Sequence, residues 1–120
     1  MDPSTTKALI EMSLDADKAI DITTIPLDEQ TSLADYMIIA TGTSTRHVAA
    51  LAGKIKERLE KRGVRDIKLE GLGQSDWVVI DAGDVIVHIF RPEVRSFYNI
   101  EKMWGMAQPF SVVQNHAYIS

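Results

Sequence analysis

The sequence contains no cysteine, which excludes a disulfide framework, a thiolate metal site and a thiol nucleophile. It has no uninterrupted apolar run longer than five residues, far below the ~20 that a membrane-spanning helix needs. Acidic residues outnumber basic ones by 17 to 13, so there is no general basic coat for nucleic acid. Residues 1–4 have neither the basic nor the apolar segment of a secretory signal. These absences predict a soluble, cytoplasmic protein with no membrane partner and no sequence-specific nucleic-acid partner.

The 120 residues have the length and composition of one globular domain, with 45% hydrophobic and 25% charged residues. Regular hydrophobic spacing runs as far as Trp104, whereas the segment after it is polar and without pattern. We therefore expect a single domain over residues 1–104 and a loosely held or partner-docking tail over residues 105–120.

Three segments have the spacing of helices. In residues 5–19, Ser4, Thr5 and Thr6 offer N-caps. A second helix after residues 42–45 has the clearest apolar stripe: Val48, Leu51, Ala52, Ile55 and Leu59. Gly63 stands where a glycine commonly ends a helix. The third predicted helix covers residues 93–103.

Five segments have the composition of strands: residues 20–24, 34–41, 64–69, 77–81 and 85–90. The second is almost continuously apolar, as expected for a central strand covered on both faces. The last two are joined by Ala82, Gly83 and Asp84, which indicates an antiparallel hairpin. The order of elements predicts an α/β domain, with a mixed sheet of about five strands flanked by helices.

The turn from the second strand to the second helix has two interpretations. Backbone N–H groups at a helix N-terminus, with the hydroxyls of Thr43, Ser44 and Thr45, could hold a phosphate. Arg46 and His47 favour that reading slightly, but the lysine of a Walker loop and the glycines of a dinucleotide fingerprint are missing. The alternative, which we favour, is that Thr43 or Ser44 caps the helix and Gly42 permits a tight turn.

Metal and catalytic groupings are weak. Asp76, Asp81 and Asp84 lie on or beside the hairpin, where paired carboxylates could hold a divalent cation, although aspartates are common in turns for local reasons. His47, His88 and His116 have no metal-ligand spacing, and we expect His88 to be a sheet residue bonded to a neighbour. We predict no catalytic residue, no metal and no cofactor.

Trp77 begins a strand directly after a polar loop with two glycines. Buried, it would be a core residue. Exposed at a sheet rim, it is the residue type that contributes most to protein interfaces, commonly ~2 kcal/mol or more on truncation. The sequence pattern leaves both readings open.

Several ordered segments resemble the ribosomal silencing factor family, also called Iojap-like. These segments are residues 31–48, 70–71, 76–81, 83–90, 92–98 and 101–104. The resemblance covers roughly residues 5–104 in order, which makes it far more specific than any single motif. Residues 110–120 match no segment of the family.

The resemblance implies a nucleotidyltransferase-like fold without its catalytic acids, in agreement with the absence of an acidic-x-acidic strand motif after Ser44. It implies binding to the large ribosomal subunit through ribosomal protein L-fourteen, on the face that meets the small subunit. Occupying that face would block subunit joining and repress translation. The family also acts in ribosome assembly, and some relatives self-associate, which leaves a homodimer open.

From these readings we expect a partner-binding surface with Trp77 as its aromatic anchor. The expected apolar contacts on the sheet surface are Val79, Val87 and Ile89, and Tyr98 is a weaker candidate. Acidic side chains that would meet a basic partner are Glu70, Asp76, Asp81 and Asp84. Two rival functions stay open: a residual phosphate-binding or nucleotidyl-transfer enzyme that uses residues 42–46, and an adaptor in ribosome assembly.

Overall fold

The computed structural model describes residues 1–27 and 34–94. Its elements follow in the order α1 (Pro3–Ala16), β1 (Ile20–Pro26), β2 (Tyr36–Thr41), α2 (Thr45–Lys61), β3 (Lys68–Glu70), β4 (Trp77–Asp81) and β5 (Val85–Phe90). The strands form one sheet in the order β1-β2-β5-β4-β3. The β2–β5 pair is parallel, and the other three pairs are antiparallel. The predicted α/β architecture with a five-stranded mixed sheet is confirmed.

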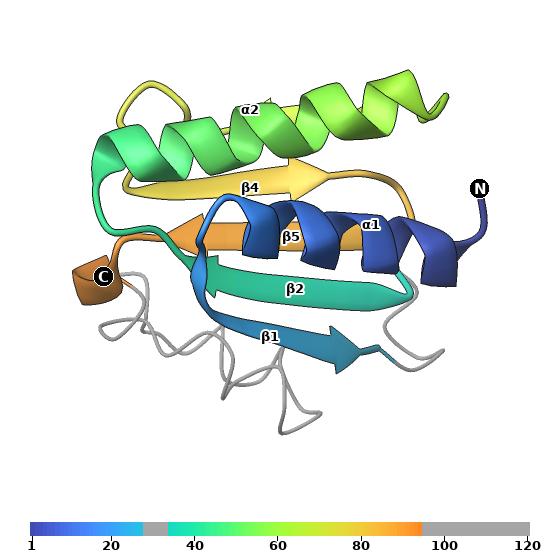
Figure 1. Cartoon of the computed structure of the whole chain (residues 1–120), viewed down its shortest axis with the longest axis horizontal. Helices are drawn as coiled ribbons and strands as arrows, with labels where there is room; N and C mark the ends of the chain where they lie inside the picture. The colour runs from blue at the N-terminus through green and yellow to red at the C-terminus, as the bar shows by residue number, and fades with distance from the viewer. Residues whose placement is uncertain (28–33, 95–120) are drawn as a thin grey trace, which may run out of the picture.

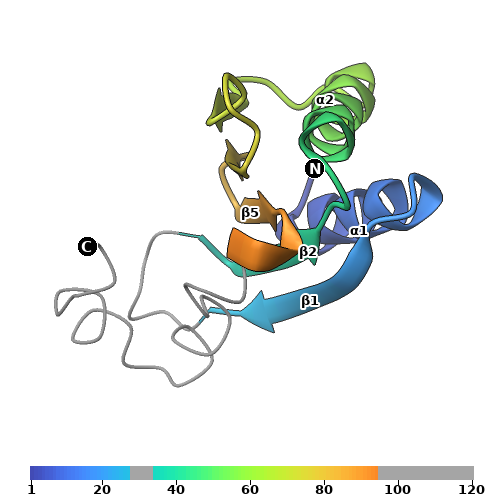
Figure 2. The same cartoon turned by 90° about the vertical axis from the view of Figure 1, so that its left-hand side faces the viewer.

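Both described helices cover the same face of the sheet (Figures 1 and 2). Ile10 and Leu14 of α1 share a buried cluster with the apolar stripe of α2 and with inward residues of β2, β4 and β5. The stripe predicted for α2 is buried in full: Val48, Leu51, Ala52, Ile55 and Leu59. Alternation along the strands sends the other half of their side chains to the opposite face.

The helix ends have identifiable causes. The Ser44 hydroxyl accepts a hydrogen bond from the His47 backbone N–H at 3.1 Å and caps α2, as the favoured reading of this turn predicted. Gly42 lies so close to α2 that a Cβ there would be 2.8 Å from a Val48 methyl carbon. Gly63 follows α2 with a φ of 92°, a conformation that favours glycine.

Several boundaries differ from the predictions: α1 ends at Ala16, β1 extends to Pro26 and β2 begins at Tyr36. The α1 helix begins at Pro3 and is capped by the Asp2 carboxylate, not by a residue among 4–6, because proline is well tolerated in the first helical turn. The strand expected over residues 64–69 is the short β3. The helix expected over residues 93–103 begins with a turn at Pro92, but its remainder lies outside the described residues, as does the expected boundary at residue 104.

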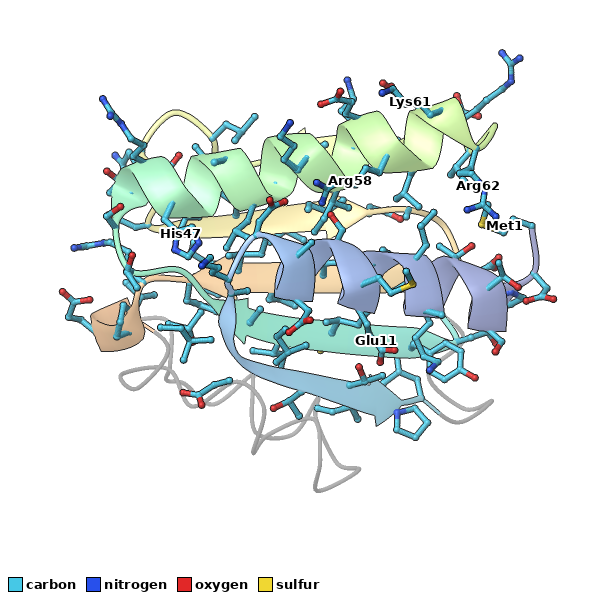
Figure 3. All side chains as sticks on the ribbon, viewed as in Figure 1. Met1, Glu11, His47, Arg58, Lys61 and Arg62 are labelled. Carbon is cyan, nitrogen blue, oxygen red and sulfur yellow. The ribbon has the colours of Figure 1, made fainter. Side chains whose placement is uncertain are left out.

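The two helices are fastened to each other by polar contacts near the end of α1 (Figure 3). Arg58 Nη1 donates to the Ser13 hydroxyl at 2.7 Å and lies 2.8 Å from the Asp17 carboxylate. His47 Nδ1 accepts from the Thr43 N–H at 2.9 Å, so its Nε2–H is the donor toward the Asp17 carbonyl, also at 2.9 Å. These bonds fix α2 against α1 independently of the apolar core.

A second buried cluster lies on the sheet face opposite the helices. It consists of Met37, Ile39 and Phe90, with Ile25, Leu27, Trp77 and Val94 packed against it. This face is therefore apolar at the β2–β5 centre and aromatic toward one end of β4.

Neither α1 nor α2, the helices of the described residues, has the length and apolar character of a membrane-spanning helix.

Candidate partner-binding site

An aromatic cluster forms where β4 begins and β5 ends. Register pairs Trp77 with Phe90, and their rings stack with centroids 4.9 Å apart. His88 lies 5.9 Å from each of these rings, nearly parallel to Phe90 and tilted against Trp77. Phe90 is fully buried, whereas Trp77 and His88 are half-buried. The structure thus places Trp77 between the two readings of its sequence context: it packs on the core and stays partly accessible.

A hydrogen bond joins two members of this cluster. The Trp77 indole N–H donates to His88 Nδ1 at 3.0 Å. Burial lowers the pKa of His88 to about 4, which keeps the imidazole neutral at physiological pH. A neutral ring can accept at Nδ1, so the bond and the charge state support each other. The expectation that His88 bonds to a sheet neighbour is confirmed.

The loop before Trp77 is tightly organised. A Cβ on Gly71, whose φ is 94°, would lie 2.3 Å from the Trp77 carbonyl oxygen, so only glycine fits. Ser75 is buried with a φ of 57°, and its hydroxyl donates to the Leu72 carbonyl at 2.8 Å. Its backbone N–H donates to the Gly71 carbonyl at 2.8 Å. The loop therefore delivers Trp77 to the sheet in one defined position.

Asp76 is engaged within the chain. Its carboxylate lies 2.9 Å from Arg91 Nε, and its carbonyl accepts from the Arg91 backbone N–H at 3.1 Å. Arg91 also pairs with Glu93 at 3.4 Å. One oxygen of the Asp76 carboxylate is thus already paired within the chain, and its contact with a basic partner stays a prediction. Sequence reasoning missed Arg91, since nothing in the sequence shows that it returns beside Asp76.

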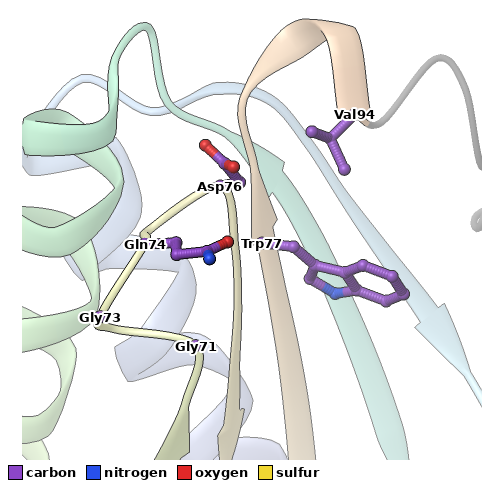
Figure 4. Close-up of a pocket in the computed structure, with 6 residues that line it drawn as sticks. All are labelled: Gly71, Gly73, Gln74, Asp76, Trp77 and Val94. Carbon is purple, nitrogen blue, oxygen red and sulfur yellow. The ribbon is translucent and has the colours of Figure 1, made fainter.

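A pocket of about 480 Å³ adjoins the aromatic cluster (Figure 4). The Asp76 carboxylate and the Trp77 indole point to different sides in this view. The described residues that line the pocket are Gly71, Gly73, Gln74, Asp76, Trp77 and Val94. This hollow beside an accessible indole is suited to the side chains of a partner protein.

Two of the predicted contacts are wrong. Val87 and Ile89 are both 0% exposed and belong to the core beneath the helices. The reason is the two-residue period of β5, which places them on the face opposite His88. Val79 pairs with His88 in register and is half-buried on the aromatic face, so it remains a candidate contact.

The acidic candidates do not form one cluster. Asp76 precedes β4, whereas Asp81 ends it, so the length of the strand separates them. Asp81 accepts from the Gly83 backbone N–H at 2.9 Å and thereby stabilises the hairpin turn, and Asp84 is an exposed residue of that turn. Glu70 is exposed on β3 opposite Val79. Tyr98 lies outside the described residues.

The structure also bears on metal and phosphate binding. In residues 1–27 and 34–94, no group of three or more histidine, aspartate or glutamate side chains could hold a metal ion. At the turn before α2, the Ser44 hydroxyl and the Thr43 N–H already take part in the cap and the His47 bond, which leaves little there for a phosphate. The fold and the site together describe a small α/β domain in which a half-buried tryptophan beside a pocket is the candidate protein-binding surface.

The chain belongs to the ribosomal silencing factor family. The family model RsfS, described as "Ribosomal silencing factor during starvation", matches residues 2–118. The chain is 53% identical over 104 residues to the ribosomal silencing factor of Zymomonas mobilis, covering 87% of this chain and 78% of that protein. It is also 35% identical over 93 residues to the mouse "Mitochondrial assembly of ribosomal large subunit protein 1", covering 75% of this chain and 41% of that protein.

The fold agrees with a crystal structure from the same group of relatives. The chain superposes on a Chromobacterium violaceum protein with a TM-score of 0.84 and 38% identity, covering 92% of this chain and 99% of that one. The predicted family is therefore confirmed, and with it a role in ribosome silencing and translational regulation.

Proposed function

We propose that this protein binds the large ribosomal subunit through ribosomal protein L-fourteen and sterically prevents the small subunit from joining. The observation that supports this most directly is the half-buried Trp77 beside its pocket, held by a rigid loop and by His88. Preorganised aromatic side chains of this kind provide most of the binding energy in protein interfaces. The proposal needs no bond to be made or broken.

The size of the domain suits this mechanism. A standard interface buries ~1,600 Å² in total, which one sheet face and its rim can provide. Of the four acidic candidates, Glu70, Asp81 and Asp84 have no basic partner among the described residues, and they would meet the basic surface of a ribosomal protein. The net charge of −4 would disfavour contact with bare RNA, which adds selectivity for protein.

A subunit-joining experiment tests the proposal. Separated large and small subunits are mixed with and without the protein and resolved by sedimentation. We expect fewer joined ribosomes with the wild-type protein and restored joining with Trp77→Ala. Met12→Ala is a matched control, because Met12 is a 67% exposed apolar residue on α1, away from the aromatic face. Unchanged joining in the presence of the wild-type protein would refute the proposal.

A second candidate function is an adaptor in assembly of the large subunit, as the name of the mouse relative suggests. An adaptor would act by recruiting a further factor, so it would leave purified subunits free to join. The purified two-subunit mixture therefore separates the two functions.

The remaining alternative is a phosphate-binding enzyme on a nucleotidyltransferase-like fold. It predicts thermal stabilisation by nucleotides with magnesium, ~2.7 kcal/mol when the ligand is 100-fold above its dissociation constant. We expect no such shift, because the Thr43 N–H and the Ser44 hydroxyl of the turn before α2 are already bonded to His47.

A further inference from the structure

His88 lies in the middle of β5 on the aromatic face. Register places it between Val79 of β4 and Ile39 of β2. Its ring contacts in the described part of the chain are Trp77 and Phe90. These four described neighbours are all uncharged, and they surround the imidazole at the centre of the face that we assign to the partner.

The hydrogen bond from Trp77 decides which ring nitrogen is protonated. An indole N–H can only donate, so His88 Nδ1, 3.0 Å away, must accept. Because burial keeps the ring neutral, its single proton resides on Nε2. The indole N–H of Trp77 is therefore bonded within the chain. The donor that this pair can offer to a partner is the Nε2–H of His88.

That donor has no acceptor in the described part of the chain. The only hydrogen bond of His88 there is the one at Nδ1. On a half-buried imidazole, a donor without a protein acceptor can be hydrated in the free protein and can exchange that water for an acceptor of a partner. The Nε2–H is thus a donor that the fold holds ready and leaves unused.

We propose that His88 is a partner-binding residue whose Nε2–H donates to a backbone carbonyl oxygen of the protein partner that packs on Trp77. This rests on the function proposed above and adds one specific polar contact to it. An uncharged acceptor fits because Val79 and Ile39 flank the imidazole, and a carboxylate or phosphate between them would lose much of its hydration. In the same residue, Nδ1 fixes the orientation of the indole.

The substitution His88→Asn separates the two roles. An asparagine amide can accept from the Trp77 indole near the position of Nδ1 but cannot reach the position of Nε2. With isolated ribosomal protein L-fourteen and with large subunits, we expect about tenfold weaker binding and unchanged tryptophan fluorescence, the effect of one lost hydrogen bond. His47→Asn is the matched control, because it removes an imidazole on the helix side and should leave affinity unchanged.

Wild-type affinity of His88→Asn, with unchanged fluorescence, would overturn the inference without affecting the proposed function. A loss seen with large subunits but not with the isolated protein would also overturn it, since the acceptor would then be RNA or another component. If the wild-type protein binds neither, the proposed function itself fails.

Nuclear magnetic resonance of ¹⁵N-histidine decides the case in which His88→Asn does not fold or changes the fluorescence. We expect the Nε2–H tautomer in the free protein, with a proton that exchanges rapidly with water and is protected on addition of the partner protein. Protection already present in the free protein, or rapid exchange within the complex, would contradict the proposal.

Discussion

Asp76 and Arg91 join the start of β4 to the residue that follows β5 by two bonds. The side chains form an ion pair at 2.9 Å, and the Arg91 backbone N–H donates to the Asp76 carbonyl at 3.1 Å. Trp77 is the next residue after Asp76, so this double connection holds the base of the indole against the sheet. We therefore expect Asp76 to act by positioning Trp77, and the direct contact predicted from the sequence stays to be tested.

This relationship predicts that Asp76→Asn and Arg91→Gln weaken binding to large subunits to a similar extent. Both substitutions remove the same ion pair. If Asp76 instead contacted a basic partner directly, Arg91→Gln would free the carboxylate and strengthen binding. Sedimentation binding assays with the two variants therefore distinguish the two roles.

The same pair should contribute little to global stability. Both side chains are about one-third exposed, at 32% and 40%, and pairs of this kind contribute ~0.5–1 kcal/mol. A double-mutant cycle with Asp76→Ala and Arg91→Ala, measured by urea unfolding, should give a coupling in this range. A coupling of several kcal/mol would contradict this account of a partly solvated pair.

Gly71→Ala should destabilise the protein and move Trp77. The left-handed backbone and the short approach to the Trp77 carbonyl together should cost about 1–3 kcal/mol. Gly73→Ala is the matched control, because a Cβ at that position meets nothing within 4 Å. Urea unfolding and tryptophan fluorescence measure the two effects, and equal behaviour of both variants would refute the constraint.

Stability should fall as the pH is lowered from about 6.5 to about 4 because of His88. In that window the unfolded chain takes up a proton on this histidine, whereas the folded chain does not until its pKa of about 4. The unfolded state then binds more protons, so the free energy of unfolding decreases, by about 3 kcal/mol in all. Above pH 6.5 His88 contributes no pH dependence.

The measurement is urea unfolding of the wild type and His88→Asn over this range. The difference between the two proteins should change with pH only in the window, because all other titrating groups are common to both. A pH-independent difference would show that His88 is protonated as easily in the folded state as in the unfolded one.

Ser44→Ala should lower stability by about 1 kcal/mol through loss of the α2 cap. Thr45 is the next residue and is exposed, so Thr45→Ala should change the stability much less than Ser44→Ala does. The turn would have to be interpreted differently if Thr45→Ala were the more damaging substitution in thermal unfolding.

Periodicity made most of the fold predictable. The α2 stripe needs no tertiary information, because only one face of a helix with that spacing can be apolar. The hairpin strands β4 and β5 match the predicted residues 77–81 and 85–90. The turn residues between them fix the end of β4 and the start of β5. The N-cap of α1 was predicted wrongly because several adjacent polar residues could serve equally well.

The site was less predictable. Alternation shows that Val87 and Ile89 share a face, but not whether helices or a partner cover it. Arg91 and His88 were missed as members of the site because their relevance depends on strand pairing, which brings them beside Asp76 and Trp77 across the hairpin.

By itself the sequence determined the family, the succession of elements and the presence of a tryptophan after a constrained loop, since these depend on residue types and local spacing. Only the tertiary structure decided which sheet face the helices cover, which carboxylate is already paired and which nitrogen of His88 carries the proton. Those features depend on distances between residues remote in the chain, and local propensity contains no information about such distances.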